Sequence, residues 1–510
     1  MTRPICTAGH CCGILLLGFC LWSTPGVQAT AAEPSSLDAA AAVERVMVDA
    51  IAGSDRSVVS IARVAKAAEA DASRAADAQP HLIPQADGFE GRLNQGPPDP
   101  TNPDFVPSAF ATGVVLDRRG LVLTNHHVLA LQEPSDFFIT TPARKVFRAR
   151  IKTADPFSDL AVLEVVDSVG EKDFTPIKLG DASTLRKGQI VIALGNPYAI
   201  ARDGQASASW GIVSNLQRKA ASTPDYDFIQ GKFERKDTMH HFGTLIQTDA
   251  KLNLGTSGGA LVNLKGEMIG LTTSLAAVAG YEQPAGYAIP VDDTFRRVVE
   301  RLKQGREVAY GFLGVGKLYT SEVPGGAQGV RVGMVVTGTP ADRAGIREND
   351  IITRIEDDPI ADVDGLMLHV GKLPAAATAK IVVDREGRTL RRDVTLAKRA
   401  VHGAKVVSTL EPAWRGLRVD YPTALEDFMD RVRATGERFD GCVIASDVER
   451  DSPAWKAGLR RGVLITHVGA VAVETPEEFQ RQIAKERQSV TLRLAADGRG
   501  ATTVVSVAAQ

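Results

Sequence analysis

Two kinds of apolar and polar pattern follow one another along the first part of the chain. SLDAAAAVERVMVDAIA (Ser36–Ala52) suits a helix, with Ser36 or Asp38 as its cap, and RSVVSIARV after it predicts a β-strand. Between Phe110 and Val299 the pattern changes to short β-type runs separated by glycine-marked turns, such as DLAVLEVV and QIVIALG. This alternation is typical of an all-β sandwich or a pair of barrels. DDTFRRVVERLKQG (Asp292–Gly305) then predicts a closing helix that stops at its glycine.

Beyond Gly305 the chain repeats itself. PADRAGIRENDIITRIEDDPI (Pro340–Ile360) is answered by PAWKAGLRRGVLITHVGAVAV (Pro453–Val473), and a β-type run, GMVVTG or GCVIAS, precedes each copy. Cys442 of the second copy takes the place of Met334 in the first, so it is expected to be a small buried side chain. The repeat predicts two related domains of roughly ninety to a hundred residues each.

Two polar insertions interrupt the β-rich region. Residues 65–107 are first rich in Ala and charge and then dense in Pro and Asn, which predicts a surface insertion or flexible loop. Residues 218–243 carry His240 and His241 without companion ligands at a recognisable spacing, so we expect solvated imidazoles and no metal site.

Length and composition place the chain among globular proteins. A chain of 510 residues is too long for one ordinary core and suggests about three domains. It is 44% hydrophobic and 24% charged, with a formal net charge of −2. So small a charge argues against a nucleic-acid partner or an anionic membrane surface.

The N-terminal stretch has the layout of a secretory signal. Arg3 precedes the apolar run CCGILLLGFCLW, and the small-residue pattern VQA ends at Ala29. We expect a signal peptide over residues 1–29, because the run is shorter than the about 20 residues that span a bilayer; an uncleaved anchor is the alternative. Four of the five cysteines lie in this segment, so the mature chain keeps only Cys442 and no internal disulfide.

Three stretches carry candidate chemistry. A serine hydroxyl needs a base to take its proton and a third group to hold that base. NLGTSGGALVN offers Ser257, VLTNHHVL offers His126 and His127, and DPFSDLAVLEV offers Asp159. A glycine-rich turn containing a serine is common by itself, so the prediction depends on the three stretches occurring together.

Taken together, GVVLDRRGLVLTNHHVL, DPFSDLAVL, VIALGNP, QTDAKLNLGTSGGALVNLKGEMIGL and GYAIP resemble the HtrA/Deg family of trypsin-like serine endopeptidases, and the two tail repeats resemble PDZ domains. The resemblance implies a mainly β fold, with a chymotrypsin-like double β-barrel followed by two PDZ domains. The corresponding ranges are 30–305 for the protease domain, 306–400 for the first PDZ domain and 408–510 for the second.

The resemblance also implies roles for single residues. Ser257 would be the nucleophile, His127 the general base and Asp159 its orienting acid, while the N–H groups of Gly255 and Ser257 would form the oxyanion hole. His127 is preferred over His126 because the family's histidine directly precedes the valine of HV. This sequence departs from the family pattern near the serine, at Lys251, Leu254, Thr256 and Ala260. These departures bear on how rigidly the turn before Ser257 is held and on which substrates are cleaved. Lys251 either favours an acidic substrate side chain before the scissile bond or points to solvent.

PDZ-like domains imply a second binding surface, on which an extended peptide adds a strand and its C-terminal carboxylate meets N–H groups of a glycine-containing loop. YGFLG and WRGL match that loop, and the residues expected to bind peptide are Tyr310, Gly311, Phe312, Leu313, Trp414, Gly416 and Leu417. Whether the second PDZ domain binds peptide or serves assembly stays open.

The function implied is an exported, periplasmic endopeptidase that degrades unfolded or damaged proteins, with no metal or other cofactor. The family usually assembles from trimers, so a homotrimer or trimer-based oligomer is expected, and peripheral association with a membrane is left open. Two alternatives remain. One is a PDZ-bearing chaperone or scaffold on an inactive protease fold, and the other is a regulatory protease with one specific substrate.

Overall fold

The computed structural model describes most of the chain from Ser36 onward. The described residues are 36–66, 107, 109–196, 204–220, 225–227, 232–234, 238–273, 285–323, 326–428, 431–432, 441–485, 488–495 and 503–509. The predicted signal peptide (1–29), most of the first insertion and part of the second lie outside these residues.

Helix α1 (Ser36–Ser54) and strand β1 (Val58–Ala65) follow the helix and strand predicted for this stretch, with the short 3₁₀ turn η1 (Asp55–Ser57) between them. None of the helices in the described ranges is both long and apolar enough to cross a membrane.

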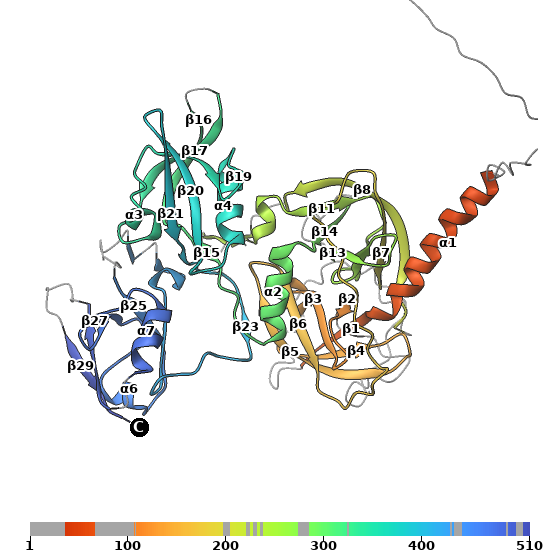
Figure 1. The fold of residues 1–510 in the computed structure, drawn as a ribbon. Coiled ribbons are helices and arrows are strands. Elements are labelled where there is room, and N and C mark those ends of the chain that lie inside the picture. The colour runs from red at the N-terminus through yellow and green to blue at the C-terminus, as the bar shows by residue number, and fades with distance from the viewer. Residues whose placement is uncertain are drawn as a thin grey trace, which may run out of the picture. The chain divides into compact units, whose positions relative to one another are not determined.

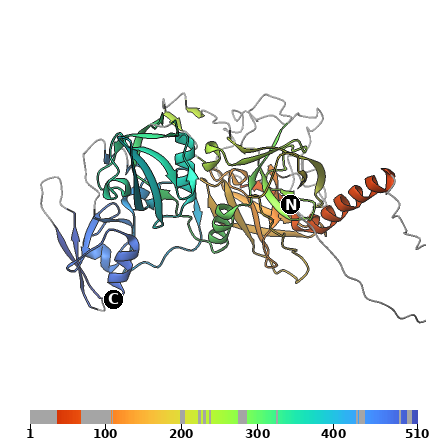
Figure 2. The ribbon, with the colours of Figure 1, turned by 45° about the horizontal axis from the view of Figure 1, so that its top comes forward.

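Six strands close a first barrel. They are β1, β2 (Ala109–Val115), β3 (Leu121–Asn125), β4 (Ser135–Thr140), β5 (Val146–Asp155) and β6 (Leu160–Val165). Their order is β5-β4-β1-β2-β3-β6, and pairing of β5 with β6 closes the ring. The barrel is filled by Val, Ile, Leu and Phe side chains such as Ile61, Ile139 and Leu163, which are at most 1% exposed. Figures 1 and 2 show these strands mostly in orange.

A second closed barrel has the order β11-β14-β13-β12-β7-β8. Its strands are β7 (Ile190–Gly195), β8 (Ser207–Arg218), β11 (Leu245–Thr248), β12 (Ala260–Val262), β13 (Met268–Thr273) and β14 (Gly286–Pro290). A separate two-stranded hairpin, β9 (Asp225–Asp227) with β10 (Lys232–Glu234), belongs to the second insertion. The chymotrypsin-like double barrel and the mainly β fold are thus confirmed.

Helix α2 (Asp293–Lys303) closes this region as predicted. The Asp292 carboxylate caps it by accepting a hydrogen bond from the Phe295 N–H at 2.9 Å. Phe295, Val298, Val299 and Leu302 form its buried face. Gly305 has φ +74°, a left-handed conformation that suits glycine and ends the helix.

Two sheets of the same design follow. The first has the order β16-β17-β18-β20-β21, with β16 (Val315–Glu322), β17 (Gln328–Val335), β18 (Ile351–Ile355), β20 (Thr378–Arg385) and β21 (Arg388–Thr395). Strand β19 (Asp358–Pro359) pairs with β18, and β15 (Gly311–Phe312) pairs with β22 (Ala397–Lys398). Helices α3 (Pro340–Arg343) and α4 (Val363–Lys372) complete the unit.

The second sheet repeats this order as β24-β25-β26-β28-β29. Its strands are β24 (Leu417–Asp420), β25 (Val443–Val448), β26 (Leu464–Val468), β28 (Val490–Leu494) and β29 (Val504–Val507), and β27 (Val471–Ala472) pairs with β26. Helices α6 (Pro453–Lys456) and α7 (Pro476–Ile483) correspond to α3 and α4, and the 3₁₀ turn η5 (Pro422–Ala424) follows β24. Cys442 is 2% exposed and packs with Val336, Ile444 and Leu464, so the prediction of a buried cysteine is confirmed.

The segment between the two repeats returns to the first barrel. Strand β23 (Val406–Val407) pairs with Thr153 and Ala154 of β5. This short strand therefore lies beside the end of β5, from which the chain turns towards Asp159.

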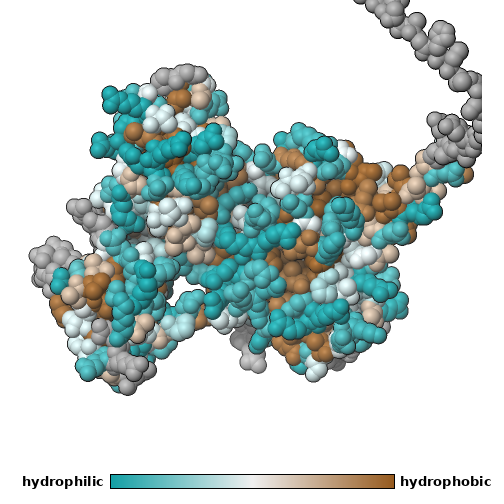
Figure 3. Space-filling model, viewed as in Figure 1, coloured by the Kyte–Doolittle hydropathy of each residue, from teal (hydrophilic) through white to brown (hydrophobic). Residues whose placement is uncertain are grey.

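The outer surface of β8 is unusually apolar for an exposed strand. Alternate residues point outward, and among them Trp210 is 64% and Ile212 36% exposed. Figure 3 shows hydrophobic residues gathered over this part of the second barrel. A contiguous apolar patch on a protein surface is a candidate interaction site.

Candidate active site

His127 and Asp159 meet where two neighbouring strands end. His127 begins the 3₁₀ turn η2 (His127–Leu129), two residues after the last residue of β3, and Asp159 directly precedes β6. Because β3 and β6 are antiparallel with Asn125 opposite Leu160, the two side chains come to the same edge of the barrel. The Nδ1 atom of His127 lies 2.9 Å from Oδ2 and 3.0 Å from Oδ1 of Asp159.

Asp159 is fixed by several donors besides the imidazole. Its carboxylate accepts the His127 backbone N–H at 3.0 Å and the Asn125 side-chain amide at 3.1 Å, and the Thr273 hydroxyl lies at 3.4 Å. The residue is 2% exposed and has φ +53°, a left-handed conformation that Asp tolerates better than most residues. These contacts leave the carboxylate little freedom to turn away from His127.

Electrostatics favours a charged aspartate beside a basic imidazole. Burial raises the pKa of Asp159, but the charge of His127 and its hydrogen bonds outweigh burial and hold that pKa below its usual value. Burial lowers the pKa of His127, but the charge and hydrogen bond of Asp159 outweigh it, so that pKa lies above its usual value. The pair suits a neutral imidazole that can accept a proton and be stabilised once charged.

Ser257 lies in a turn whose glycines are required by close contacts. Gly258 has φ +85°, and a Cβ on it would lie 2.1 Å from the Thr112 carbonyl oxygen and 2.3 Å from the Thr124 hydroxyl. The Ser257 carbonyl accepts the Thr112 N–H at 3.0 Å. The turn therefore packs closely against β2 at Thr112 and against β3 at Thr124, and Thr124 is three residues before His127.

The same turn is also tied to the strand that reaches Asp159. The Thr272 carbonyl accepts the Gly258 N–H at 2.9 Å, and the Thr272 hydroxyl donates to the Thr256 carbonyl at 2.5 Å. Thr273, the next residue, is the one whose hydroxyl lies near Asp159. The structure thus brings Ser257, His127 and Asp159 to one place, from both barrels.

Thr112 also anchors the turn through its side chain. Its hydroxyl donates to the Gly255 carbonyl at 2.7 Å and accepts the Asn196 N–H at 2.9 Å. The next N–H along, that of Thr256, donates to the Asn253 carbonyl at 3.1 Å. The peptide unit after Gly255 is therefore held at both its oxygen and its nitrogen.

The residues that depart from the family pattern have different surroundings. The Thr256 hydroxyl donates to the Asn253 carbonyl at 2.6 Å and so closes the turn, and Ala260 is fully buried in β12. Leu254 is 67% exposed, and Lys251 is also exposed. Lys251 contributes its carbonyl oxygen, which accepts a hydrogen bond from the Ser209 hydroxyl at 2.9 Å.

The expectation that Tyr310 binds peptide is wrong for this structure. Tyr310 is completely buried, and its hydroxyl donates to Oδ2 of Asp155 at 2.5 Å while its ring packs edge-on against Phe157. Gly311 is buried as well and donates its N–H to the Leu373 carbonyl at 2.8 Å. Tyr310 thus joins the start of the first repeat to the loop that carries Asp159.

The remaining predicted peptide-binding residues are mostly core or turn residues. Leu313 is 3% exposed, and half-buried Phe312 packs edge-on against Phe428 at 6.0 Å between ring centroids. In the second repeat, Trp414 and Leu417 exchange two backbone hydrogen bonds around Gly416, which has φ +83°. These positions shape the loops, and a peptide would meet their backbone more than their side chains.

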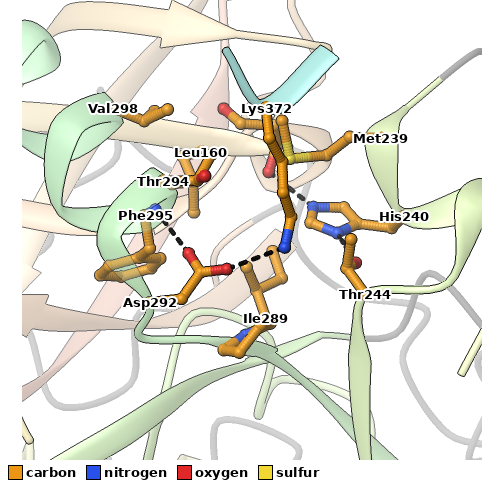
Figure 4. Close-up of a pocket in the computed structure, with 12 residues that line it drawn as sticks. Leu160, Met239, His240, Thr244, Ile289, Asp292, Thr294, Phe295, Val298 and Lys372 are labelled. Carbon is orange, nitrogen blue, oxygen red and sulfur yellow. Dashed lines mark hydrogen bonds and ion pairs between the residues drawn. The ribbon is translucent and has the colours of Figure 1, made fainter. Parts of the chain in front are cut away.

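The prediction of a solvated imidazole is wrong for His240. It lies in the 3₁₀ turn η4 (Met239–Phe242), is 1% exposed and has hydrogen-bond partners at both ring nitrogens, so it is not a solvated imidazole. Figure 4 shows it beside Thr244 in a pocket that Asp292 and Lys372 also line. No local signal marked it, because Ser158, one of its partners, is 82 residues away in sequence.

His126 has a different contact from His127. Its Nε2 donates to the carbonyl of Ala404 at 2.6 Å, in the segment just before β23. Within the described part of the chain, no cluster of three or more His, Cys, Asp or Glu side chains could hold a metal ion.

Comparisons with known proteins match the three parts of the chain. The family model of a trypsin-like peptidase domain matches residues 111–271, and two PDZ-domain models match residues 294–396 and 444–495. The periplasmic serine endoprotease DegP of Salmonella typhimurium is 29% identical over 392 residues, covering 75% of this chain and 73% of that protein. A probable periplasmic serine endoprotease of Pseudomonas fluorescens, described as DegP-like, is 29% identical over 441 residues, covering 82% and 85%.

Among solved structures, the HtrA-type protease AlgW with a decapeptide matches with a TM-score of 0.48 and 23% identity. That match covers 69% of this chain and 98% of the other. A serine endoprotease from Yersinia pestis matches with a TM-score of 0.43 and 22% identity, covering 69% and 97%.

Proposed function

This chain is a serine endopeptidase of the HtrA/Deg type with a trypsin-like fold and two PDZ domains, and we propose that it is exported and degrades unfolded or damaged proteins. The observation that carries the proposal is the convergence of His127, Asp159 and the Ser257 turn at the junction of the two barrels. Export to the periplasm is supported by the signal-like residues 1–29 and by the names of the relatives.

The proposed mechanism proceeds through an acyl-enzyme. His127 takes the proton of the Ser257 hydroxyl while the serine oxygen attacks the scissile carbonyl, and Asp159 holds the ring and stabilises the imidazolium. Collapse of the tetrahedral intermediate breaks the C–N bond, and His127 gives the proton to the leaving amine. Water then attacks the acyl-enzyme, with His127 as base again, and releases the acid product and the serine.

The turn before Ser257 would supply the oxyanion hole. The N–H groups of Gly255 and Ser257 are the proposed donors to the oxygen that becomes negative in the transition state. Gly255 has φ +92°, and a Cβ on it would lie 2.6 Å from the Asn196 carbonyl oxygen, so only glycine fits there. Because Thr112 and Asn253 hold the neighbouring peptide unit, the donors would be oriented before substrate arrives.

The two PDZ domains would bind extended peptides along their outer strands. β16 and β24 each end their sheet and have one paired neighbour in the sheet order, which leaves the other edge for an added strand. Helix α4 packs beside β16, and α7 packs beside β24, so each edge has a helix next to it. C-terminal peptides of substrates or activators are the proposed ligands.

We expect the enzyme to associate with itself. Trp210 and Ile212 are exposed on β8, where an apolar surface would be shielded by a second copy. A homotrimer or trimer-based oligomer is the assembly that the family resemblance implies, and light scattering with size-exclusion chromatography would test it.

Digestion of casein, an unfolded protein, tests the proposal. The wild type should degrade casein and Ser257→Ala should not. Ser489→Ala is the control and should behave as the wild type, because Ser489 is an exposed serine in the second repeat, outside the protease region. Equal digestion by wild type and Ser257→Ala would refute the nucleophile. Capture of casein without cleavage by every variant would favour a scaffold on an inactive protease fold.

A further inference from the structure

The turn η4, at the end of the second insertion, lies behind the loop that carries Asp159. The Met239 N–H donates to the Phe157 carbonyl at 2.8 Å, and the His240 carbonyl accepts the Ala220 N–H at 2.9 Å. His240 itself is 1% exposed. The second insertion therefore contacts the Asp159 loop through the Met239 backbone and through the His240 side chain.

The partners of His240 fix which ring nitrogen carries the proton. Nε2 lies 2.8 Å from the Ser158 carbonyl oxygen, which can only accept, so Nε2 must be the donor. Nδ1 is then the acceptor for the Thr244 hydroxyl at 2.6 Å (Figure 4). Burial lowers the pKa of His240, and although nearby Asp159 and Asp292 oppose burial, the lower pKa keeps the ring neutral.

The carbonyl that His240 holds belongs to the peptide immediately before Asp159. Ser158 is held at its other end too, because its N–H and its hydroxyl both donate to Oδ2 of Asp155, at 3.0 and 2.5 Å. Asp159 follows with φ +53°, a conformation of higher energy that persists only where its surroundings hold it. A change in this peptide would redirect the Asp159 carboxylate.

We propose that His240 is a positioning residue for Asp159, whose Nε2–H bond to the Ser158 carbonyl maintains the left-handed turn that directs the carboxylate to Nδ1 of His127. The inference rests on the proposed catalytic role of Asp159. It gives the second insertion a function in catalysis, and it requires one ring nitrogen of His240 in particular.

Two amide variants separate that nitrogen from the rest of the ring. The amide of Gln reaches the position of Nε2, whereas the amide of Asn reaches only that of Nδ1. We expect His240→Asn to lower kcat about tenfold with little change in KM, since a buried acceptor loses its donor. His240→Gln should stay within about threefold of the wild type.

The proton between His127 and Asp159 gives a readout that a purely structural role would not change. In ¹H NMR, the low-field resonance of the His127 Nδ1–H should persist in His240→Gln and move upfield or broaden in His240→Asn. Retention of kcat and resonance by His240→Asn would overturn the inference. Equal losses in both variants would also overturn it, because they would show that the ring matters rather than its Nε2–H.

The wild type provides a test that does not depend on how the variants fold. The chain has nine histidines, so ¹⁵N-histidine labelling is practical, and His240 should show the Nε2–H tautomer. An Nδ1–H tautomer would refute the inference, since Nε2 could not then donate. Asp159→Asn should be measured alongside, because wild-type activity in that variant would refute the role of Asp159 itself, whatever His240 does.

Discussion

The Thr112 hydroxyl offers a quantitative test of how the Ser257 turn is held. Thr112 is completely buried. Thr112→Val replaces its hydroxyl by a methyl group and changes the volume of the side chain little. The change takes the donor from the Gly255 carbonyl and the acceptor from the Asn196 N–H. The backbone bonds of Thr112, including the one to the Ser257 carbonyl, are unaffected because valine keeps its own N–H and C=O.

The expected loss of stability and rate follows from the two groups that lose the Thr112 hydroxyl, namely the Gly255 carbonyl and the Asn196 N–H. A buried polar group that loses its partner costs about 1–3 kcal/mol, so two such groups cost about 2–4 kcal/mol after partial relaxation. If about half of this appears in the transition state for acylation, kcat falls about tenfold, since 1.4 kcal/mol corresponds to a factor of ten. The rest should appear as a lower melting temperature of the protease region.

Acylation by a fluorophosphonate probe and cleavage of a fluorogenic peptide measure the two parts of this prediction. Thr112→Val should be slower in both, with a similar KM, and Thr112→Ser should recover most of the rate because it restores the hydroxyl. A Thr112→Val enzyme with wild-type kcat and an unchanged melting temperature would show that the hydroxyl does not hold the turn.

Three further predictions follow from the same site. Asp159→Asn should lower kcat about 10⁴-fold. Without the aspartate charge, burial alone acts on the pKa of His127, so the acid limb of the kcat/KM profile should move from above the ordinary histidine value of 6.5 to below it. An unchanged acid limb would contradict the electrostatic coupling of Asp159 to His127. Gly258→Ala should lose about 100-fold or more in the acylation rate, because the added Cβ would meet the Thr112 carbonyl oxygen, and near wild-type labelling would contradict this. Lys251→Ala should leave the cleavage profile of a peptide library unchanged, since Lys251 is exposed; loss of a preference for Asp or Glu before the scissile bond would assign Lys251 to the substrate pocket.

Much of the fold could be predicted because its signals are local. Strand periodicity, glycine turns and the repeat after Gly305 depend on residues close together in the chain, and the double barrel and the repeated sheets agree with them. The candidate triad was also within reach, because each member lies in a short motif at the end of a strand. The ranges given for the domains stay predictions, as do the catalytic roles.

The errors concern side chains whose partners are distant in sequence. Tyr310 meets Asp155 across 155 residues, and His240 meets Ser158 across 82, so no spacing rule relates them. Taken alone, the stretch around Tyr310 predicts a peptide-binding aromatic residue, and the stretch around His240 predicts a solvated imidazole. Burial and the hydrogen bonds behind the Asp159 loop, which only the folded chain reveals, give both residues a supporting role instead.

The most direct test of the account is to find which residue a fluorophosphonate probe modifies in the active protein. Mass spectrometry of the labelled enzyme should place the adduct on Ser257, with labelling abolished in Ser257→Ala and slowed at least about 10³-fold in His127→Ala. An adduct on another residue, or an enzyme that digests casein while Ser257 stays unmodified, would contradict the proposed site.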